Sequence, residues 1–186
     1  MKKTNRLLLN VLLSTVLLAL SVPALADTSD GIVELTPGTS NPNGPLALNE
    51  VPGFDFGSNE IQTTEQTYTT NADALLSVSD TRGTGSGWNV TANITDFSDG
   101  THQLIGAEFT LPAVVPVTSG NAVKPADGVA TVLNAVDQPI LSAQVGEGLG
   151  QWDSQYNNAQ LKVPSGNYAG AYTATIEWTL TDGPNP

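Results

Sequence analysis

The stretch Tyr172-Thr173-Ala174-Thr175-Ile176-Glu177-Trp178-Thr179-Leu180 decides the fold class of this chain. Every second residue is apolar, and every residue between is Thr or Glu. This period of two is typical of a β-strand with one buried face and one solvated face. Asp182-Gly183-Pro184 ends the strand, because Pro has no N–H to donate to a ladder. A strand this regular must pair with earlier strands, so we expect the domain to close around it, with this strand in the interior.

The rest of the chain also consists of short β-like segments. Trp88–Thr95 alternates as cleanly, with apolar residues at 88, 90, 92 and 94. Two glycine-rich loops are expected, at 80–87 and at 146–152, and no stretch shows a sustained helical period. The pattern predicts an all-β, single antiparallel β-sandwich or barrel-like domain with long Gly/Pro-rich loops. Further strands are expected at Gly31–Leu35, Ala74–Ser79, Ala107–Leu111, Gly128–Val136, Ile140–Val145 and Leu161–Val163, and Leu46-Ala47-Leu48 and Phe54-Asp55-Phe56 are short alternating segments.

The first 26 residues are typical of a secretory signal peptide. Lys2, Lys3 and Arg6 form a basic head, an apolar run follows, and Ala24-Leu25-Ala26 is a small-x-small cleavage site. The apolar run is shorter than the roughly 20 residues that span a membrane, so cleavage before Asp27 is expected rather than an uncleaved anchor. We therefore expect one domain over 27–186, secreted, with no transmembrane segment after cleavage.

The charge of residues 27–186 limits the partners that this domain can bind. It holds all 18 acidic residues but only three basic ones, Arg82, Lys124 and Lys162, which gives −15. Nucleic acid is excluded as a partner, because binding it needs clustered Lys and Arg. The chain has no Cys, so neither a disulfide framework nor a lipid-attachment cysteine is expected, and no sorting signal occurs near residue 186. Attachment to a cell surface would be noncovalent.

Catalytic and metal-binding motifs are not found. With 18 carboxylates, some pair will lie at glycosidase spacing by chance, and nothing selects one. His102 is the only histidine and has no Cys or acidic ligand at metal spacing, so a surface or turn histidine is the better interpretation. Ser86 lacks the Gly-x-Ser-x-Gly elbow. We expect no enzyme activity and no cofactor.

Three segments together resemble the WxL domain of Gram-positive bacterial surface proteins. They are 80–90, with Trp88-Asn89-Val90; 146–152, Gly-Glu-Gly-Leu-Gly-Gln-Trp; and 172–180, with Trp178-Thr179-Leu180. The second Trp-x-Leu motif is intact, and the first is relaxed to Trp-Asn-Val, which keeps an apolar residue on the same face. The resemblance implies noncovalent attachment to the cell wall, with peptidoglycan or another wall glycan as the ligand. It also implies a partner, a membrane-anchored surface protein that interacts with WxL proteins.

Aromatic residues are the candidate ligand contacts, because a flat apolar ring matches the C–H face of a sugar. Trp152, in the second glycine-rich loop beside Tyr156, fits this role best, although a loop tryptophan can also cover a core. Trp88, Trp178 and Leu180 are further candidates. Because both tryptophans lie on apolar strand faces, a buried core position is the favoured interpretation of each.

Two function classes remain open. One is a wall-binding module. The other is a non-enzymatic subunit of a surface complex whose main contact is a partner protein.

Overall fold

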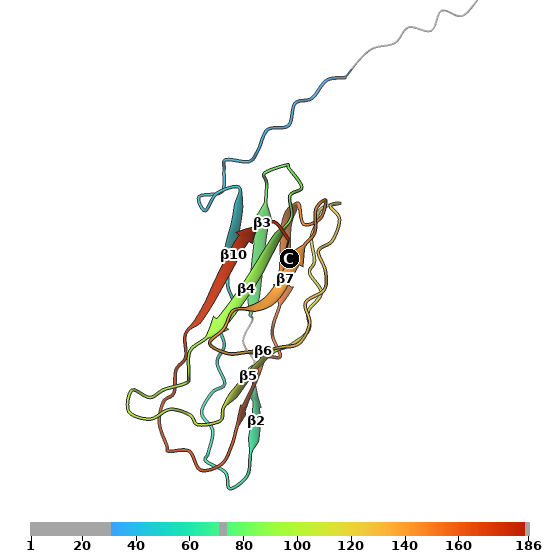
Figure 1. Ribbon diagram of the computed structural model, residues 1–186. Coiled ribbons are helices and arrows are strands. Elements are labelled where there is room, and N and C mark those ends of the chain that lie inside the picture. The colour runs from blue at the N-terminus through green and yellow to red at the C-terminus, as the bar shows by residue number, and fades with distance from the viewer. Residues whose placement is uncertain (1–30, 71–73, 185–186) are drawn as a thin grey trace, which may run out of the picture. The chain divides into compact units, whose positions relative to one another are not determined.

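A computed structural model describes residues 31–70 and 74–184 (Figure 1). The expected signal peptide, residues 1–26, lies outside these ranges. The chain divides into two units, Met1–Glu34 and Leu35–Pro186. In the first unit, the described residues 31–34 form no strand, so the strand expected at Gly31–Leu35 is wrong. The apolar side chains of Ile32 and Val33 are exposed.

The second unit is all-β, as predicted. Its described residues form ten strands and no helix. The strands are β1 (Leu46–Glu50), β2 (Gln66–Thr69), β3 (Leu75–Asp80), β4 (Trp88–Ile94), β5 (Glu108–Leu111), β6 (Thr131–Leu133), β7 (Gln138–Ala143), β8 (Gly150–Gln155), β9 (Gln160–Val163) and β10 (Ile176–Asp182).

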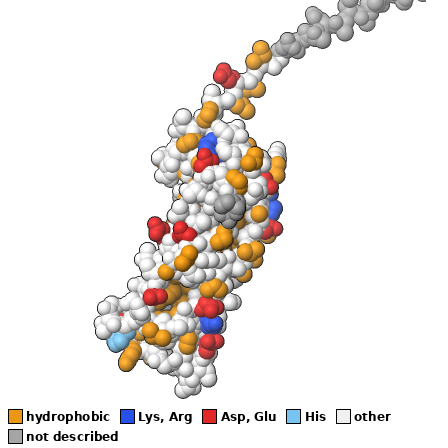
Figure 2. Space-filling view, viewed as in Figure 1, with side chains coloured by type: hydrophobic (Ala, Val, Ile, Leu, Met, Phe, Trp, Pro, Cys, Tyr) orange, Lys and Arg blue, Asp and Glu red, His pale blue; other side chains and the backbone are white. Residues whose placement is uncertain are grey.

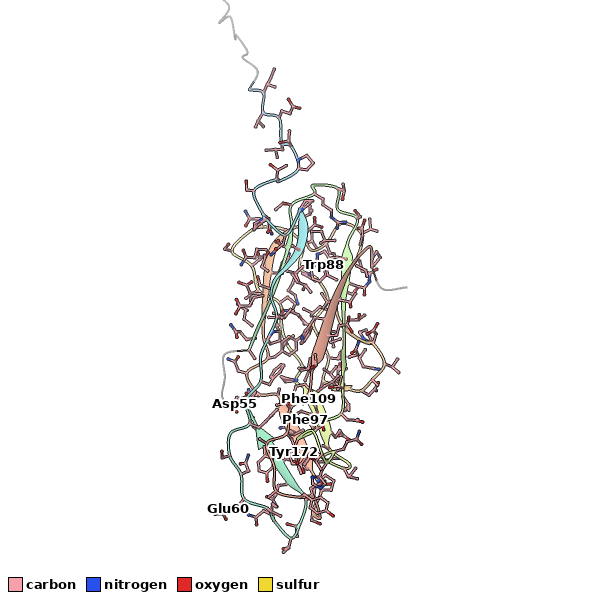
Figure 3. All side chains as sticks on the ribbon, turned by 90° about the vertical axis from the view of Figure 1, so that its left-hand side faces the viewer. Asp55, Glu60, Trp88, Phe97, Phe109 and Tyr172 are labelled. Atoms are coloured by element: carbon pink, nitrogen blue, oxygen red, sulfur yellow. The ribbon has the colours of Figure 1, made fainter. Side chains whose placement is uncertain are left out.

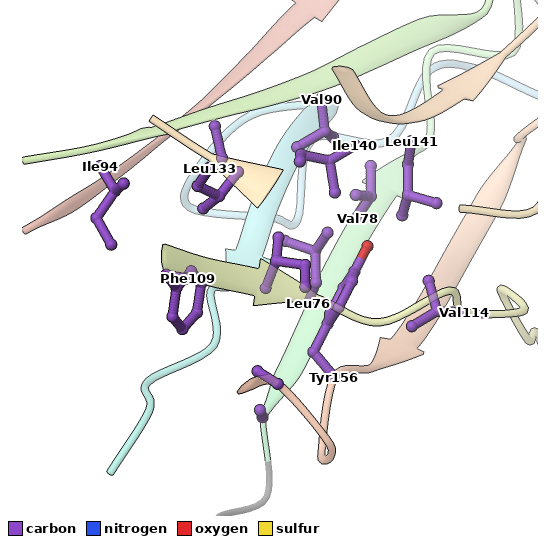
Figure 4. Packing of buried hydrophobic residues seen from close by; sticks show 14 of the residues in the cluster. Leu76, Val78, Val90, Ile94, Phe109, Val114, Leu133, Ile140, Leu141 and Tyr156 are labelled. Atoms are coloured by element: carbon purple, nitrogen blue, oxygen red, sulfur yellow. The ribbon is translucent and has the colours of Figure 1, made fainter. Parts of the chain in front are cut away.

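These strands make three antiparallel sheets. Two have three strands, in the orders β1-β3-β8 and β10-β4-β7, and one has four, in the order β2-β9-β5-β6. The inner faces of all three contribute to a single hydrophobic cluster, part of which Figure 4 shows, with Leu76, Val90 and Tyr156 among the labelled residues. The arrangement is sandwich-like, and it places β4 next to the core along its whole length.

Strand β4 and strand β10 pair through seven consecutive residues, from Ile94 opposite Ile176 to Trp88 opposite Asp182. The alternation of β4 is strict, because its apolar residues are buried and its polar ones half-buried. Strand β10 keeps the predicted alternation but has a neighbour on one side only, so its expected interior position is wrong. A period of two shows which face of a strand is buried. It does not show how many strands pair with it, because pairing occurs in the plane of the sheet.

The two glycine-rich segments meet around the side chain of Trp88. The N–H of Gly146 donates to the carbonyl of Gly85 at 2.8 Å, and Nε1 of Trp88 donates to the carbonyl of Gly148 at 3.0 Å. A Cβ at Gly148 would lie 2.5 Å from Nε1 of Trp88 and 2.5 Å from Cβ of Ala143. Glycine at 148 is therefore a condition for burying this indole and satisfying its N–H.

Arg82 joins the end of β3 to the end of β10. Its guanidinium donates to both carboxylate oxygens of Asp80, at 2.9 and 2.8 Å, to the carbonyl of Gly87 at 2.8 Å, and to Asp182. Hydrogen bonding to Asp80 raises the pKa of Arg82 above its ordinary value. The Asp80 side chain is fully buried, so the cation compensates a charge that would otherwise be costly there.

The packing of Gly148 gives a stability prediction with a matched control. Gly148 and Gly146 both have positive φ, but a Cβ at Gly146 meets no atom within 4 Å. Alanine at either position costs about 1–2 kcal/mol of backbone strain. Only Gly148→Ala also drives a methyl into Trp88, so it should lower the free energy of unfolding by about 1–3 kcal/mol more than Gly146→Ala. Urea unfolding measures both, and equal losses would contradict the packing described here.

Candidate ligand-binding groove

Three of the five candidate ligand contacts are core residues in this structure. Trp88, Trp152 and Tyr156 are 0%, 3% and 1% exposed. The core interpretation of Trp88 is thus confirmed. Trp152 does not lie in a loop as expected, because β8 already begins at Gly150. Its side chain points inward together with Ser154 and Tyr156, and its Nε1 donates to the carbonyl of Leu149 at 3.0 Å.

Trp178 and Leu180 are half-buried on β10 and pack against the core. The ring centroid of Trp178 lies 6.3 Å from that of Tyr156, so β10 and the end of β8 are in contact here. Burial raises the pKa of Tyr156, because the phenolate would lose its hydration. Trp178 thus packs beside the ring of Tyr156. It also lines an open groove.

This groove has a volume of ≈ 880 Å³. Eight of the eleven aromatic side chains of the chain line it, and the three that do not are the buried Trp88, Trp152 and Tyr156. Figure 3 shows Phe97, Phe109 and Tyr172 close together in this part of the unit. Figure 2 shows hydrophobic side chains at the surface in the lower half of the view, where the four-stranded sheet lies. The eight are Phe54, Phe56, Tyr68, Phe97, Phe109, Tyr168, Tyr172 and Trp178.

Alternating strand residues form the floor and one wall of the groove. On the floor, Tyr68 of β2, Leu161 of β9 and Phe109 of β5 come from three adjacent strands of the four-stranded sheet. On the wall, Ile176 and Trp178 come from the apolar face of β10. The periodicity that builds the core therefore continues beyond it and leaves apolar side chains facing an open space.

A second wall is the segment Val51–Gln62, named the strap from here on. It joins β1 to β2 and forms no strand, although the alternation of Phe54-Asp55-Phe56 persists. Phe54 and Phe56 pack edge-on against Phe109, with ring centroids 5.0 and 5.9 Å away. Asp55 is exposed, and its N–H donates to Oγ1 of Thr70 at 3.4 Å. Aromatic contacts thus hold the strap in place.

The third wall, residues 164–174, is fastened to the 96–107 loop. The side chain of Asn167 accepts the N–H of Ile105 at 2.8 Å and donates to the carbonyls of Ile105 and Pro164 at 3.3 and 3.0 Å. The backbones of Ser98 and Thr173 exchange two hydrogen bonds of 2.9 Å. These bonds fix the backbone on both sides of Tyr168, a rim residue of the groove.

Asp99, His102 and Tyr168 form a connected group at this rim. Oδ1 of Asp99 accepts the N–H groups of Thr101 and His102, at 2.8 and 2.6 Å, and Oδ2 lies 3.2 Å from Nδ1 of His102. These N–H groups, His102 first, lower the pKa of Asp99. The imidazole stacks on the ring of Tyr168, with centroids 4.3 Å apart and planes at 24°. The hydroxyl of Tyr172 donates to the carbonyl of Tyr168 at 3.0 Å.

The charged side chains that line the groove are all acidic. Its lining contains no Lys, Arg or His, and the two charged residues that it does contain, Asp55 and Glu60, are both acidic and both on the strap. Among the described residues, no group of His, Cys, Asp and Glu could hold a metal ion. A ligand of this groove must therefore tolerate negative charge without a basic partner.

Among residues 31–70 and 74–184, no helix is long and apolar enough to cross a membrane.

Comparison with known families identifies the chain. The family described as "WxL domain surface cell wall-binding" matches residues 25–184. The chain belongs to the WxL domain family. The match confirms the resemblance drawn from the Trp-x-Leu motifs, and it makes this a wall-binding surface domain. No curated protein and no solved structure matches the chain.

The two motifs of this WxL domain lie side by side on β4 and β10, where Val90 is opposite Leu180. Their tryptophans occupy different surroundings. Trp88 is sealed beneath Gly148 at one end of the ladder, and Trp178 lines the groove nearer the other end. One motif thus serves the core, while the other also reaches an accessible surface.

Most of the groove could not be predicted from the sequence. The alternation of Phe54-Asp55-Phe56 marked the two phenylalanines as residues of one face. Tyr172 was expected on the apolar face of the last strand. Phe97 and Tyr168 lie in loops without periodicity, so no local pattern marks them.

The different surroundings of the two motif tryptophans predict different stability losses. Trp88→Ala removes a fully buried ring and should lower the free energy of unfolding by about 3–5 kcal/mol. Trp178→Ala removes a half-buried ring and should lower it by about 1–3 kcal/mol, because less apolar area is lost. Thermal and urea unfolding of both variants measure this. A larger loss for Trp178→Ala than for Trp88→Ala would contradict the assignment.

Proposed function

We propose that this WxL domain attaches noncovalently to the cell wall by binding peptidoglycan in the aromatic groove, without catalysing a reaction on it. The observation that carries the proposal is the gathering of eight aromatic side chains from six separate parts of the chain around one groove. A folded domain normally buries such residues, so an open site lined by them needs a ligand to cover it. The sequence of residues 1–26 supports secretion as the route to the wall.

The chemistry of the lining suits a wall glycan. Aromatic faces pack against the C–H faces of sugars, while amides and hydroxyls hydrogen-bond sugar substituents. Polar side chains of the lining include Asn59, Gln62 and Gln66. The groove volume falls in the range of roughly 300–1,000 Å³ common for ligand sites. Several sugar units of an extended strand could lie along the three walls.

A second candidate function is that of a complex subunit whose main contact is a partner protein, for which a membrane-anchored WxL-interacting surface protein is the proposed partner. The observation that favours it is a run of exposed valines outside the groove. All lie between residues 115 and 145, and all are more than two-fifths exposed: Val115, Val117, Val123, Val129, Val132, Val136 and Val145. Exposed apolar area of this kind is characteristic of protein contacts.

Sedimentation with purified, protein-free cell walls separates the two functions. The wild-type domain should pellet with such walls, and Tyr68→Ala should pellet about tenfold more weakly, the effect of losing roughly 1.4 kcal/mol. The matched control is Val136→Ala, which removes exposed apolar surface outside the groove and should bind like the wild type. Failure of the wild type to pellet, with recovery once wall proteins are restored, would favour the partner-protein function.

Salt and pH should change this attachment in a defined direction. The domain from residue 27 onward carries −15, and phosphate-bearing walls are anionic, so charge repulsion opposes binding over a screening length of about 10 Å at moderate ionic strength. Added salt should strengthen retention on walls. Retention should also rise as the pH falls from 8 towards about 4, where carboxylates begin to protonate. The measurement is the bound fraction across salt and pH, and binding that weakens with salt would contradict the repulsion.

A further inference from the structure

We propose that Tyr168, with His102 packed behind it, is the platform on which the groove stacks a sugar ring of the glycan strand of the wall. This inference rests on the proposed wall binding and goes one step further, because it names the glycan backbone, rather than the peptide stems, as the part of peptidoglycan that this domain recognises.

Tyr168 differs from the other aromatic residues of the groove in its exposure. Its side chain is 68% exposed, whereas the other seven are buried or half-buried. Five of those seven also belong to the hydrophobic core or pack against it: Phe54, Phe56, Phe97, Phe109 and Trp178. The ring of Tyr168 packs on the imidazole of His102, yet Tyr168 stays exposed at the groove, so its ring is available to a ligand.

The imidazole of His102 leaves one flat face of Tyr168 free. The two rings are nearly parallel, with planes at 24° and centroids 4.3 Å apart, so the imidazole covers one face of the phenol ring. The opposite face is then the one that can accept a partner. A pyranose with equatorial substituents presents a flat row of C–H groups that matches such a face.

The platform is held in position before a ligand arrives. Asp99 fixes His102 through its backbone N–H at 2.6 Å and its Nδ1 at 3.2 Å. A Cβ on Gly170 would lie 2.6 Å from the Asp99 carboxylate, so the chain after Tyr168 packs closely on the same turn. The hydroxyl of Tyr172 holds the carbonyl of Tyr168, and Asn167 fixes the preceding residue. A ring held this way loses little conformational entropy on binding.

The charges of the groove point to an uncharged glycan. Phosphate-bearing wall polymers need basic partners, and the lining has none. Asp55 and Glu60 accept hydrogen bonds, which suits the hydroxyl and acetamido N–H donors of N-acetylated sugars. A peptide stem would offer no flat C–H face to Tyr168. The ligand class is therefore a β-linked N-acetylhexosamine strand.

The test is titration of the mature domain with a soluble hexamer of β-1,4-linked N-acetylglucosamine, followed by NMR. Ring-proton and C–H signals of one sugar unit should shift upfield in the complex, because they lie over an aromatic ring. Tyr168→Ala should abolish this shift and weaken binding about tenfold, as the loss of one stacking contact implies. Tyr168→Phe should retain both, since the hydroxyl plays no part.

The role of His102 is tested by substitution and rescue. His102→Ala removes the support of the platform and should weaken binding, while His102→Phe restores a flat ring behind Tyr168 and should recover it. Leu35→Ala, at an exposed position outside the groove, should behave like the wild type. These side chains are at the surface, and unfolding curves verify that the variants are folded.

Two results would overturn the inference. If the hexamer binds but Tyr168→Ala binds equally well with the same upfield shift, the platform lies elsewhere. If the domain pellets with walls yet ignores the hexamer, or binds isolated stem peptides instead, wall binding stands and the glycan assignment fails. A domain that binds neither walls nor hexamer would refute the proposed function itself.

Discussion

The hydrogen-bonded ladder between β4 and β10 is the constraint on which the rest of the structure depends. Its seven-residue register sets which residues of both strands face inward, because a slip of one residue would turn every side chain to the other face. In this register, Trp88 reaches the pocket closed by Gly148, and Trp178 reaches the groove. The same ladder therefore stabilises the core at one end and positions part of the groove lining at the other. The Trp-x-Leu motifs mark this pairing rather than a single contact site.

Much of the fold could be predicted from the sequence, because a strand with one buried face shows an alternation of apolar and polar residues. Strands β3, β4, β5, β9 and β10 were found in this way, each to within a few residues. Strand β8 was missed, since Gly150 at its start and the buried Ser154 among its inward positions hide the period of two. Trp152 was assigned to a loop for the same reason. The interior position expected for β10 was also wrong, because neighbouring strands lie in the plane of the sheet and do not affect which residues face the core.

The groove could not be predicted to the same extent, since it is a product of topology. Its aromatic side chains come from positions as distant as Phe54 and Trp178, and only the folded sheets bring them to one place. Strand-borne members such as Phe109 looked like ordinary core residues. Phe97 and Tyr168 lie in loops, where apolar residues follow no regular period, so no sequence pattern marked them as groove residues. His102, interpreted from sequence as a turn histidine, does cap a turn with Asp99, but its stacking on Tyr168 depends on a loop more than 60 residues later.

One loop, residues 81–87, receives the segments at both ends of the second unit. The N–H of Gly38 donates to Thr81 at 2.9 Å, while the N–H of Gly183 donates to Gly87 at 3.1 Å and Arg82 holds Asp182. None of the residues that line the groove belongs to this loop. Residues 38 and 183 of the second unit therefore lie beside one loop, and a substitution that loosens this loop would release both segments while leaving the lining of the groove unchanged.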